Sequence, residues 1–175
     1  MITSTILSEV ITDQCWKLTA TLLSKYDLDD LSHPIQEYWC TFIHFAQRFD
    51  DIFAKELIEL AALARVSLDM GDEFGAKQMV GTLIDNGNES DLNFREACNK
   101  IIHANSVEIK LEWSNRHPLD NDRNGYGESR IDGKATVDRF KNPIIMTQGE
   151  YRGMEWKTNI HFLKYVSILE EKFSS

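Results

Sequence analysis

Three polar side chains in one segment of the chain have the types and the spacing that phosphoryl chemistry needs. Arg95, Asn99 and His103 follow one another at four-residue steps. Since an α-helix turns by about 100° per residue, these steps place the three side chains within about 80° of one another, on one stripe of a helix. An imidazole can move a proton near neutral pH, and a guanidinium can neutralise charge on phosphate oxygens. The three residues are therefore the candidate catalytic residues, with Asn99 placed to orient the imidazole or a phosphate.

The helix that carries this stripe is predicted to extend over residues 91–105. Ser90 or Asp91 can accept hydrogen bonds from the free N–H groups at its start. Its apolar residues occupy the neighbouring arc and are expected in the core: Phe94, Cys98, Ile101 and Ile102. The polar stripe should then line a partly accessible groove. The structural alternative is that Arg95 pairs with a carboxylate while Asn99 and His103 satisfy buried hydrogen bonds.

The segment FREACNKIIHA, residues 94–104, resembles the signature of the HEPN superfamily (higher eukaryotes and prokaryotes nucleotide-binding domain). In that family an Arg and a His lie on one helix of an all-helical bundle. A polar residue such as Asn, Asp or His usually follows the Arg, and fewer residues separate it from the His. This chain departs from the pattern on both counts, because Glu96 follows Arg95 and seven residues lie between Arg95 and His103.

The resemblance implies a metal-independent ribonuclease or an RNA-binding protein in a toxin or defence setting. The 2′-hydroxyl of the RNA would attack the neighbouring phosphorus, so no cofactor is expected. Active family members pair two such helices across a dimer, which implies a homo-oligomer. The alternative class is a catalytically inactive helical module that binds a protein partner. The net charge of −9 and the isoelectric point near 5.0 favour this alternative, because they oppose attraction to phosphates and to anionic lipid.

A second segment, DNDRNG at residues 120–125, matches the first half of a calcium-binding loop. Its oxygen ligands would be Asp120, Asp122 and Asn124, with a Gly at the sharp turn. The second half departs from the pattern, because Ile131 stands where a bidentate Glu should close the site. The five histidines of the chain show no zinc-ligand spacing. We therefore interpret the segment as a solvated turn and predict no metal site.

The elements that position these residues are predicted from the spacing of the apolar side chains. Steps of three and four residues predict helices over residues 4–26, 34–70, 72–84, 91–105 and 158–173. Gly75 and Gly81 weaken the third of these helices. Alternation at every second residue predicts strands over residues 107–113, 135–140, 143–148 and 154–157. Residues 86–88 are a predicted turn, and residues 114–134 a predicted long loop.

These elements predict an α+β fold that is mainly α: a bundle of four or five helices with a small antiparallel β-sheet inserted before the C-terminal helix. A chain of 175 residues should form a single domain. Residues 1–106 would form the bundle, 107–157 the β insertion and 158–173 the returning helix. The three cysteines, Cys15, Cys40 and Cys98, are widely spaced. Reduced thiols and a cytoplasmic location are therefore expected, with no leader and no membrane span.

Overall fold

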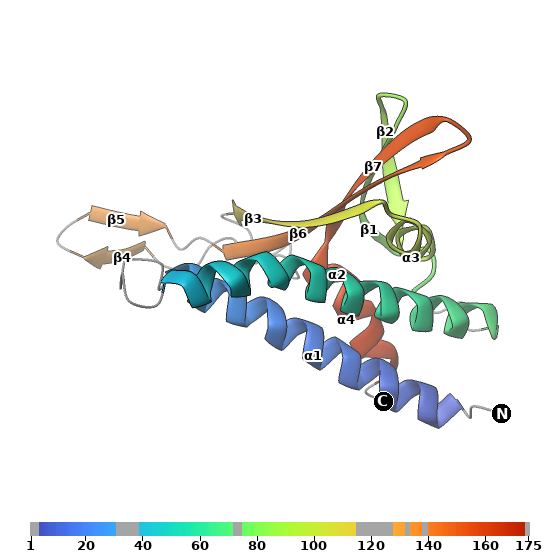
Figure 1. Cartoon of the computed structure of the whole chain (residues 1–175), viewed down its shortest axis with the longest axis horizontal. Coiled ribbons are helices and arrows are strands. Elements are labelled where there is room, and N and C mark those ends of the chain that lie inside the picture. Colours follow the sequence, from blue (N-terminus) through green and yellow to red (C-terminus); the bar gives the residue numbers. More distant parts are fainter. Residues whose placement is uncertain are drawn as a thin grey trace.

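The computed structural model describes the backbone of residues 4–30, 39–71, 75–114, 128–131, 134–137 and 140–173, and the side chains of residues 6–22, 48–71, 75–112 and 142–172. Within these ranges the chain forms four helices and a five-stranded antiparallel sheet, together with a separate two-stranded hairpin (Figure 1). This is a sheet-rich α+β fold. The predicted helical bundle with a small inserted sheet is therefore wrong.

Two long antiparallel helices, α1 (Ser4–Asp30) and α2 (Trp39–Asp69), confirm the first two predicted helices. The buried side chains of each helix recur at three- and four-residue steps, so one apolar face of each helix enters the core. Among the described side chains of α1 they are Leu7, Ile11, Cys15, Leu18 and Leu22. On α2 they include Phe49, Phe53, Leu57, Leu60, Ala61, Ala64 and Leu68. The helix α1 continues beyond its predicted end and includes Asp30.

The predicted third helix is wrong over residues 75–84, because the chain forms turns there followed by strand β1 (Met79–Asp85). Residues 72–74 lie outside the described residues. Val80 and Leu83 are buried and pack into the core from this strand. A β-carbon at Gly81 would overlap the backbone carbonyl of Asn159 on the adjacent strand. The glycine that weakens a helix at this position therefore lets two strands approach each other closely.

The predicted turn at Asn86 and Gly87 is confirmed, but it joins β1 to a second strand, β2 (Asn88–Asn93), and not to a helix. Both turn residues have positive φ, at 50° and 80°. Positive φ at both central positions is the geometry of a type I′ turn, whose twist suits a two-residue hairpin. The Asn-Gly pair is therefore typical of a β-hairpin. The apolar spacing on either side of it favoured helices instead, so the sequence predicted a turn between two helices.

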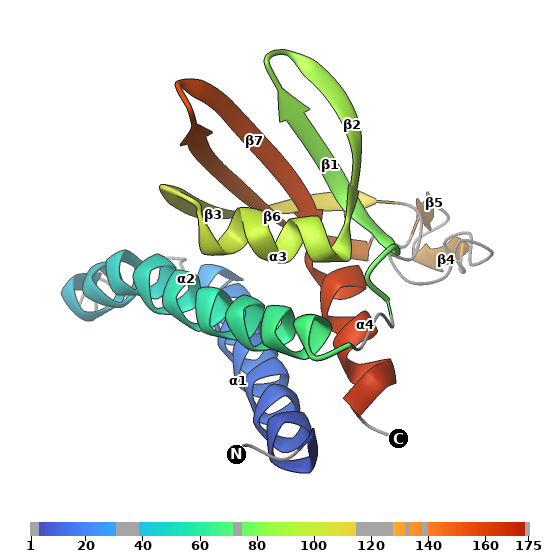
Figure 2. The ribbon, with the colours of Figure 1, turned by 90° about the vertical axis from the view of Figure 1, so that its right-hand side faces the viewer.

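The central helix α3 (Phe94–Ile102) is shorter than the predicted range of 91–105. Residues 91–93 complete β2, which pairs with β1 as far as Asn93. The Asn93 side chain caps the helix by accepting a hydrogen bond from the Glu96 N–H at 2.9 Å. Figure 2 shows α3 between the sheet and α2. The cap is thus Asn93, and not Ser90 or Asp91.

The sheet has the order β2, β1, β7, β6, β3, with every neighbouring pair antiparallel. Strand β3 (Ser106–Ser114) confirms the predicted strand at 107–113. Strands β6 (Phe140–Tyr151) and β7 (Met154–His161) are longer than predicted. Because β1 and β2 precede α3, the sheet is not an insertion that follows it.

A separate hairpin joins β4 (Glu128–Ile131) to β5 (Lys134–Val137). Strand β4 lies inside the predicted loop of residues 114–134, so that loop prediction is wrong at β4. The predicted strand at 135–140 divides between β5 and the start of β6. Residues 115–127 lie outside the described residues.

The last helix, α4 (Phe162–Phe173), starts four residues later than predicted, because residues 158–161 still pair within the sheet. Its buried residues Phe162, Tyr165 and Leu169 lie against the sheet and α1. On the sheet face toward the helices, the hydroxyls of Thr147 and Thr158 lie directly opposite each other, with 2.6 Å between their Oγ1 atoms. No helix in the described ranges is long and apolar enough to cross a bilayer.

Candidate functional site

Arg95, the first of the predicted catalytic residues, fastens the start of α3 to the end of α2. Its Nη1 donates to Asp69 Oδ1 at 3.1 Å, and its Nη2 donates to the Leu68 carbonyl at 3.2 Å. The side chain is one-third exposed. Arg65 forms a second ion pair with the same carboxylate. Arg95 is therefore a second donor to a carbonyl of the last turn of α2, which also accepts a hydrogen bond from the Gly71 N–H at 3.4 Å.

Asn99 also faces α2. Its Oδ1 accepts a hydrogen bond from Arg65 Nε at 2.9 Å. Because Arg65 contacts both Asn99 and Asp69, the two polar residues of α3 belong to one network along the end of α2. This arrangement matches the structural alternative for Arg95, which pairs with a carboxylate, more closely than an open phosphate site.

His103 lies apart from this network. It is the C-cap residue of α3, with φ −102° and ψ 13°, and its side chain is exposed. Its backbone N–H donates to the Asn99 carbonyl at 3.1 Å. Contacts with α2 thus join Arg95 and Asn99 in one network, and no hydrogen bond or ion pair among the described residues links the His103 side chain to it. Neither pocket described below is lined by any of the three residues, and a catalytic role for them stays a hypothesis.

The apolar side of α3 packs as predicted, with Phe94, Cys98 and Ile101 buried and Ile102 half-buried. Cys98 Sγ lies 3.4 Å from the hydroxyl of Tyr165. Burial raises the pKa of Cys98 to about 11 and the pKa of Tyr165 well above its ordinary value. Both groups therefore keep their protons at neutral pH, and their role is packing.

A groove of about 490 Å³ runs between α1 and α2. Its walls come from about one turn of α1 and two turns of α2, and its lining is mostly apolar. The lining residues are Val10, Asp13, Gln14, Glu59, Ala62, Leu63 and Val66. Gln14 Nε2 donates to Glu59 Oε2 at 3.2 Å across the two helices. This contact, together with the Lys17–Glu56 ion pair at 2.9 Å, fixes the register of the antiparallel pair.

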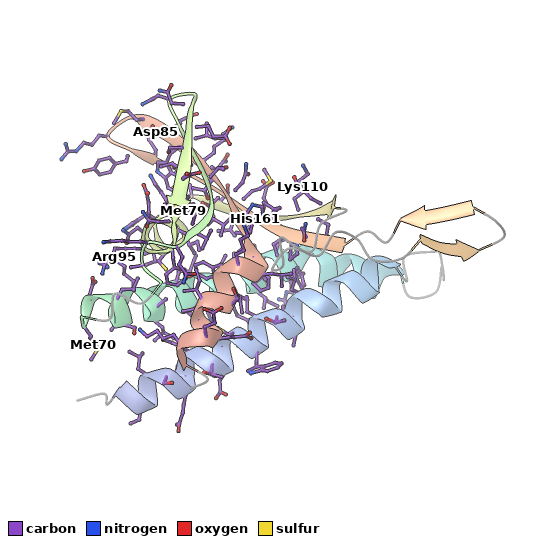
Figure 3. The ribbon with its side chains drawn as sticks, turned by 180° about the vertical axis from the view of Figure 1, so that it is seen from behind. Met70, Met79, Asp85, Arg95, Lys110 and His161 are labelled. Atoms are coloured by element: carbon purple, nitrogen blue, oxygen red, sulfur yellow. The ribbon has the colours of Figure 1, made fainter. Side chains whose placement is uncertain are left out.

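The apolar lining continues beyond the groove toward one end of the helix pair. Ile6 lies one turn before Val10 on α1, and Met70 follows the last turn of α2 beyond Val66. In the register that the Gln14–Glu59 and Lys17–Glu56 contacts set, the turn of α1 that carries Ile6 lies opposite the last turn of α2. These four side chains are between 42% and 62% exposed. Figure 3 shows Met70 at the end of α2, on the side of that helix away from the sheet.

A smaller pocket of about 160 Å³ lies where the end of α3 meets the β6–β7 hairpin. Its lining is mostly polar and includes Asn105, Gln148, Glu150, Glu155 and Lys157, together with Gly149 and Trp156. The Lys100 ammonium lies 4.4 Å from the centroid of the Trp156 ring. Glu150 and Glu155 are directly opposite each other in register. The pocket has room for a few water molecules and lacks an apolar surface for a larger ligand.

The sequence predicts no metal site, and only some of the residues considered as metal ligands are described. Asp120, Asp122 and Asn124 lie outside the described residues. Within the described ranges, no group of three or more His, Cys, Asp or Glu side chains is placed to hold a metal ion. His161 lies with Lys110 on the sheet face opposite the helices (Figure 3). Burial and the neighbouring Lys164 lower the pKa of His161.

The groove residues were not singled out by the sequence pattern. The helical period over residues 34–70 predicts a buried stripe that includes Leu57, Leu60 and Ala64, and these three residues are buried. Leu63 and Val66 fall beside it, so the apolar arc of the helix is wider than one packed face needs. An apolar arc that extends beyond the buried stripe is the signal that could have revealed the groove.

Comparisons with known proteins identify no family for the chain. No protein-family model matches it, and no curated protein or solved structure matches it. The resemblance to the HEPN superfamily therefore stays a prediction carried by residues 94–104. The function has to be inferred from the geometry of the molecule itself.

Proposed function

We propose that the protein is a protein-binding module, and that the α1–α2 groove receives a helical segment of its partner. The observation that carries this proposal is the exposed apolar line along the groove, formed by Ile6, Val10, Val66 and Met70. Apolar side chains exposed singly are ordinary, whereas a continuous line of them is typical of interaction surfaces. Exposure of this line to water is unfavourable, and a partner that covers it removes that cost.

The shape of the groove supports a helix as the bound element. Two antiparallel helices form ridges of side chains with a furrow between them, and a third helix packs by inserting its own side chains into such a furrow. An amphipathic helix that lies in an apolar groove is a common form of protein recognition. The polar residues of α3 support the same class of function, because Arg95 and Asn99 are engaged in holding α3 on α2.

A photo-crosslinking amino acid in place of Ala62, an exposed residue of the groove, tests this proposal in the cells that naturally make the protein. We expect one discrete adduct with another protein. The same amino acid at Trp16, which is 66% exposed on α1 and does not line the groove, is the matched control. The adduct should disappear when Val66→Glu is added. No adduct at position 62, or equal adducts at both positions, would overturn the proposal.

Metal-independent RNA cleavage is the second candidate function, and one observation favours it. The His103 side chain is exposed at the end of α3, one turn beyond Asn99, where it could reach a large substrate. Cleavage of mixed RNA in the presence of a chelator, lost in His103→Ala, would support it.

A further inference from the structure

We infer that the partner helix in the α1–α2 groove is cationic: an amphipathic segment of another protein that carries Lys or Arg on both sides of its apolar stripe. This inference rests on the proposed function and adds the chemistry of the partner. It is drawn from the charges that flank the apolar line and from the length of that line.

Both walls of the groove carry a carboxylate. Asp13 lies on the α1 wall and Glu59 on the α2 wall, and the seven lining residues include no cationic side chain. An apolar seam with a carboxylate on each side is complementary to an amphipathic helix whose apolar stripe has a cation on each side. Such charges at the rim of an interface select the partner and speed its association.

The neighbouring lysines offset only part of this charge. Lys17 forms its ion pair with Glu56, which is not a lining residue, at 2.9 Å. Glu56 is the main cause of the raised pKa of Lys17, and Glu59 contributes less. Lys55 lies 3.8 Å from Glu59, and both side chains are largely exposed, so water and salt weaken this pair. The rim of the groove therefore presents negative charge to an approaching segment.

A second copy of this chain fits the groove poorly. Packing the α1–α2 pair against itself would bring Asp13 and Glu59 of both copies into one seam, with four carboxylates near one another. Like charges placed together across an interface oppose association. The net charge of −9 on each copy adds to this repulsion. The homo-oligomer implied by the family resemblance would therefore need a different surface.

The length of the apolar line sets the size of the partner segment. The stretch of α2 from Glu59 to the end of the helix at Asp69 rises by about 15 Å, which corresponds to about three turns. A segment of roughly twelve residues, with apolar side chains at three- and four-residue steps, would cover it.

Two helical model peptides of fourteen residues test the inference with the full chain. Both carry the same leucine stripe, one flanked by lysines and the other by glutamates, and binding is followed by fluorescence anisotropy. We expect the lysine peptide to bind at least about ten-fold more tightly, and this preference should shrink as salt is added. Val66→Glu should weaken binding of the lysine peptide.

Paired charge variants separate a local effect from the overall negative charge. Asp13→Asn with Glu59→Gln should abolish the preference for the lysine peptide. Glu150→Gln with Glu155→Gln removes the same charge at the β6–β7 hairpin, away from the groove, and should leave the preference intact. Equal effects of the two pairs would overturn the inference, because they would show general charge attraction.

The remaining outcomes also decide the question. Equal binding of both peptides would overturn the cationic partner while leaving the groove as a docking site. Binding of neither peptide would overturn the helical occupant, and the crosslinking at position 62 would still decide whether the groove binds a protein. A dimer in light scattering that Val66→Glu dissociates would assign the groove to a second copy and contradict the inference.

Discussion

Arg95 at the start of α3 donates a hydrogen bond to Asp69 at the end of α2, with 3.1 Å between Nη1 and Oδ1. The contact gives a structural role to Arg95, which the sequence predicts as a catalytic residue. The guanidinium also reaches the Leu68 carbonyl and so completes the C-terminal turn of α2. Two helices distant in the sequence are thereby fixed to each other at the edge of the core.

Replacing Arg95 by Ala should lower the free energy of unfolding by about 1 kcal/mol. Two hydrogen bonds are lost, but the site is partly exposed and Arg65 still pairs with Asp69, so the loss stays small. Urea unfolding measures the change, with Lys77→Ala at an exposed position as the control. An unchanged midpoint would show that the contact does not fasten the helices.

Gly81→Ala should destabilise the protein by about 3 kcal/mol or prevent folding, because its β-carbon would meet the backbone of β7. Gly87→Ala provides the comparison, since a β-carbon there meets only open space and the cost comes from its φ of +80°. We expect a loss of about 1 kcal/mol at Gly87. Thermal unfolding ranks the two variants, and a smaller loss at Gly81 than at Gly87 would contradict the close approach of β1 and β7.

Stability should fall in alkaline solution because two thiols are buried. Burial raises the pKa of Cys15 from 9.0 to about 12, and that of Cys98 from 9.0 to about 11. A group whose pKa is raised by folding contributes its full stability below the unfolded pKa and loses it as pH rises toward the folded value. The decline should therefore begin near pH 9, at about 1.4 kcal/mol per pH unit for each thiol.

Urea unfolding between pH 8 and pH 10 measures this decline. Cys15→Ala should make the free energy of unfolding fall less steeply with pH, because only Cys98 of these two thiols then titrates. A free energy of unfolding that stays constant from pH 9 to pH 10 in the unmodified protein would show that the thiols are accessible to water.

Mixed RNA incubated with the purified protein and a chelator should remain intact. The guanidinium of Arg95 is engaged by Asp69, and the exposed His103 side chain shares no contact with it among the described residues, so we do not expect the two groups to act on one phosphate. Gel analysis of the RNA is sufficient. Cleavage by the unmodified protein, but not by His103→Ala, would establish a ribonuclease against this expectation.

The sequence predicted the long helices well because their apolar period is sustained over many turns. It failed at residues 75–84, where Val80 and Leu83 fit a helical step but form part of β1. It failed again at residues 158–161, because Thr158 and Ile160 alternate as a strand while Ile160 and Leu163 also fit a helix. Short segments are decided by pairing with distant strands, which local spacing does not reveal.

In the candidate site, too, local spacing predicts the helix but not the contacts with distant residues. The helical stripe of Arg95 and Asn99 exists as predicted, but the partners of these residues come from α2, more than 25 positions away in the chain. Their role therefore depends on tertiary contacts. The α1–α2 groove likewise depends on how two helices are set against each other, because neither helix alone shows which part of its apolar arc stays uncovered.

The most direct test of the protein-binding role is the affinity of the protein that crosslinks at position 62. Isothermal titration of that purified protein should give the same dissociation constant for the unmodified chain and for Trp16→Glu, whose substitution lies outside the groove. Val66→Glu, which places a charge in the groove, should weaken binding at least about ten-fold, because the carboxylate must be desolvated in the interface. Equal affinity of Val66→Glu and the unmodified chain would contradict the account.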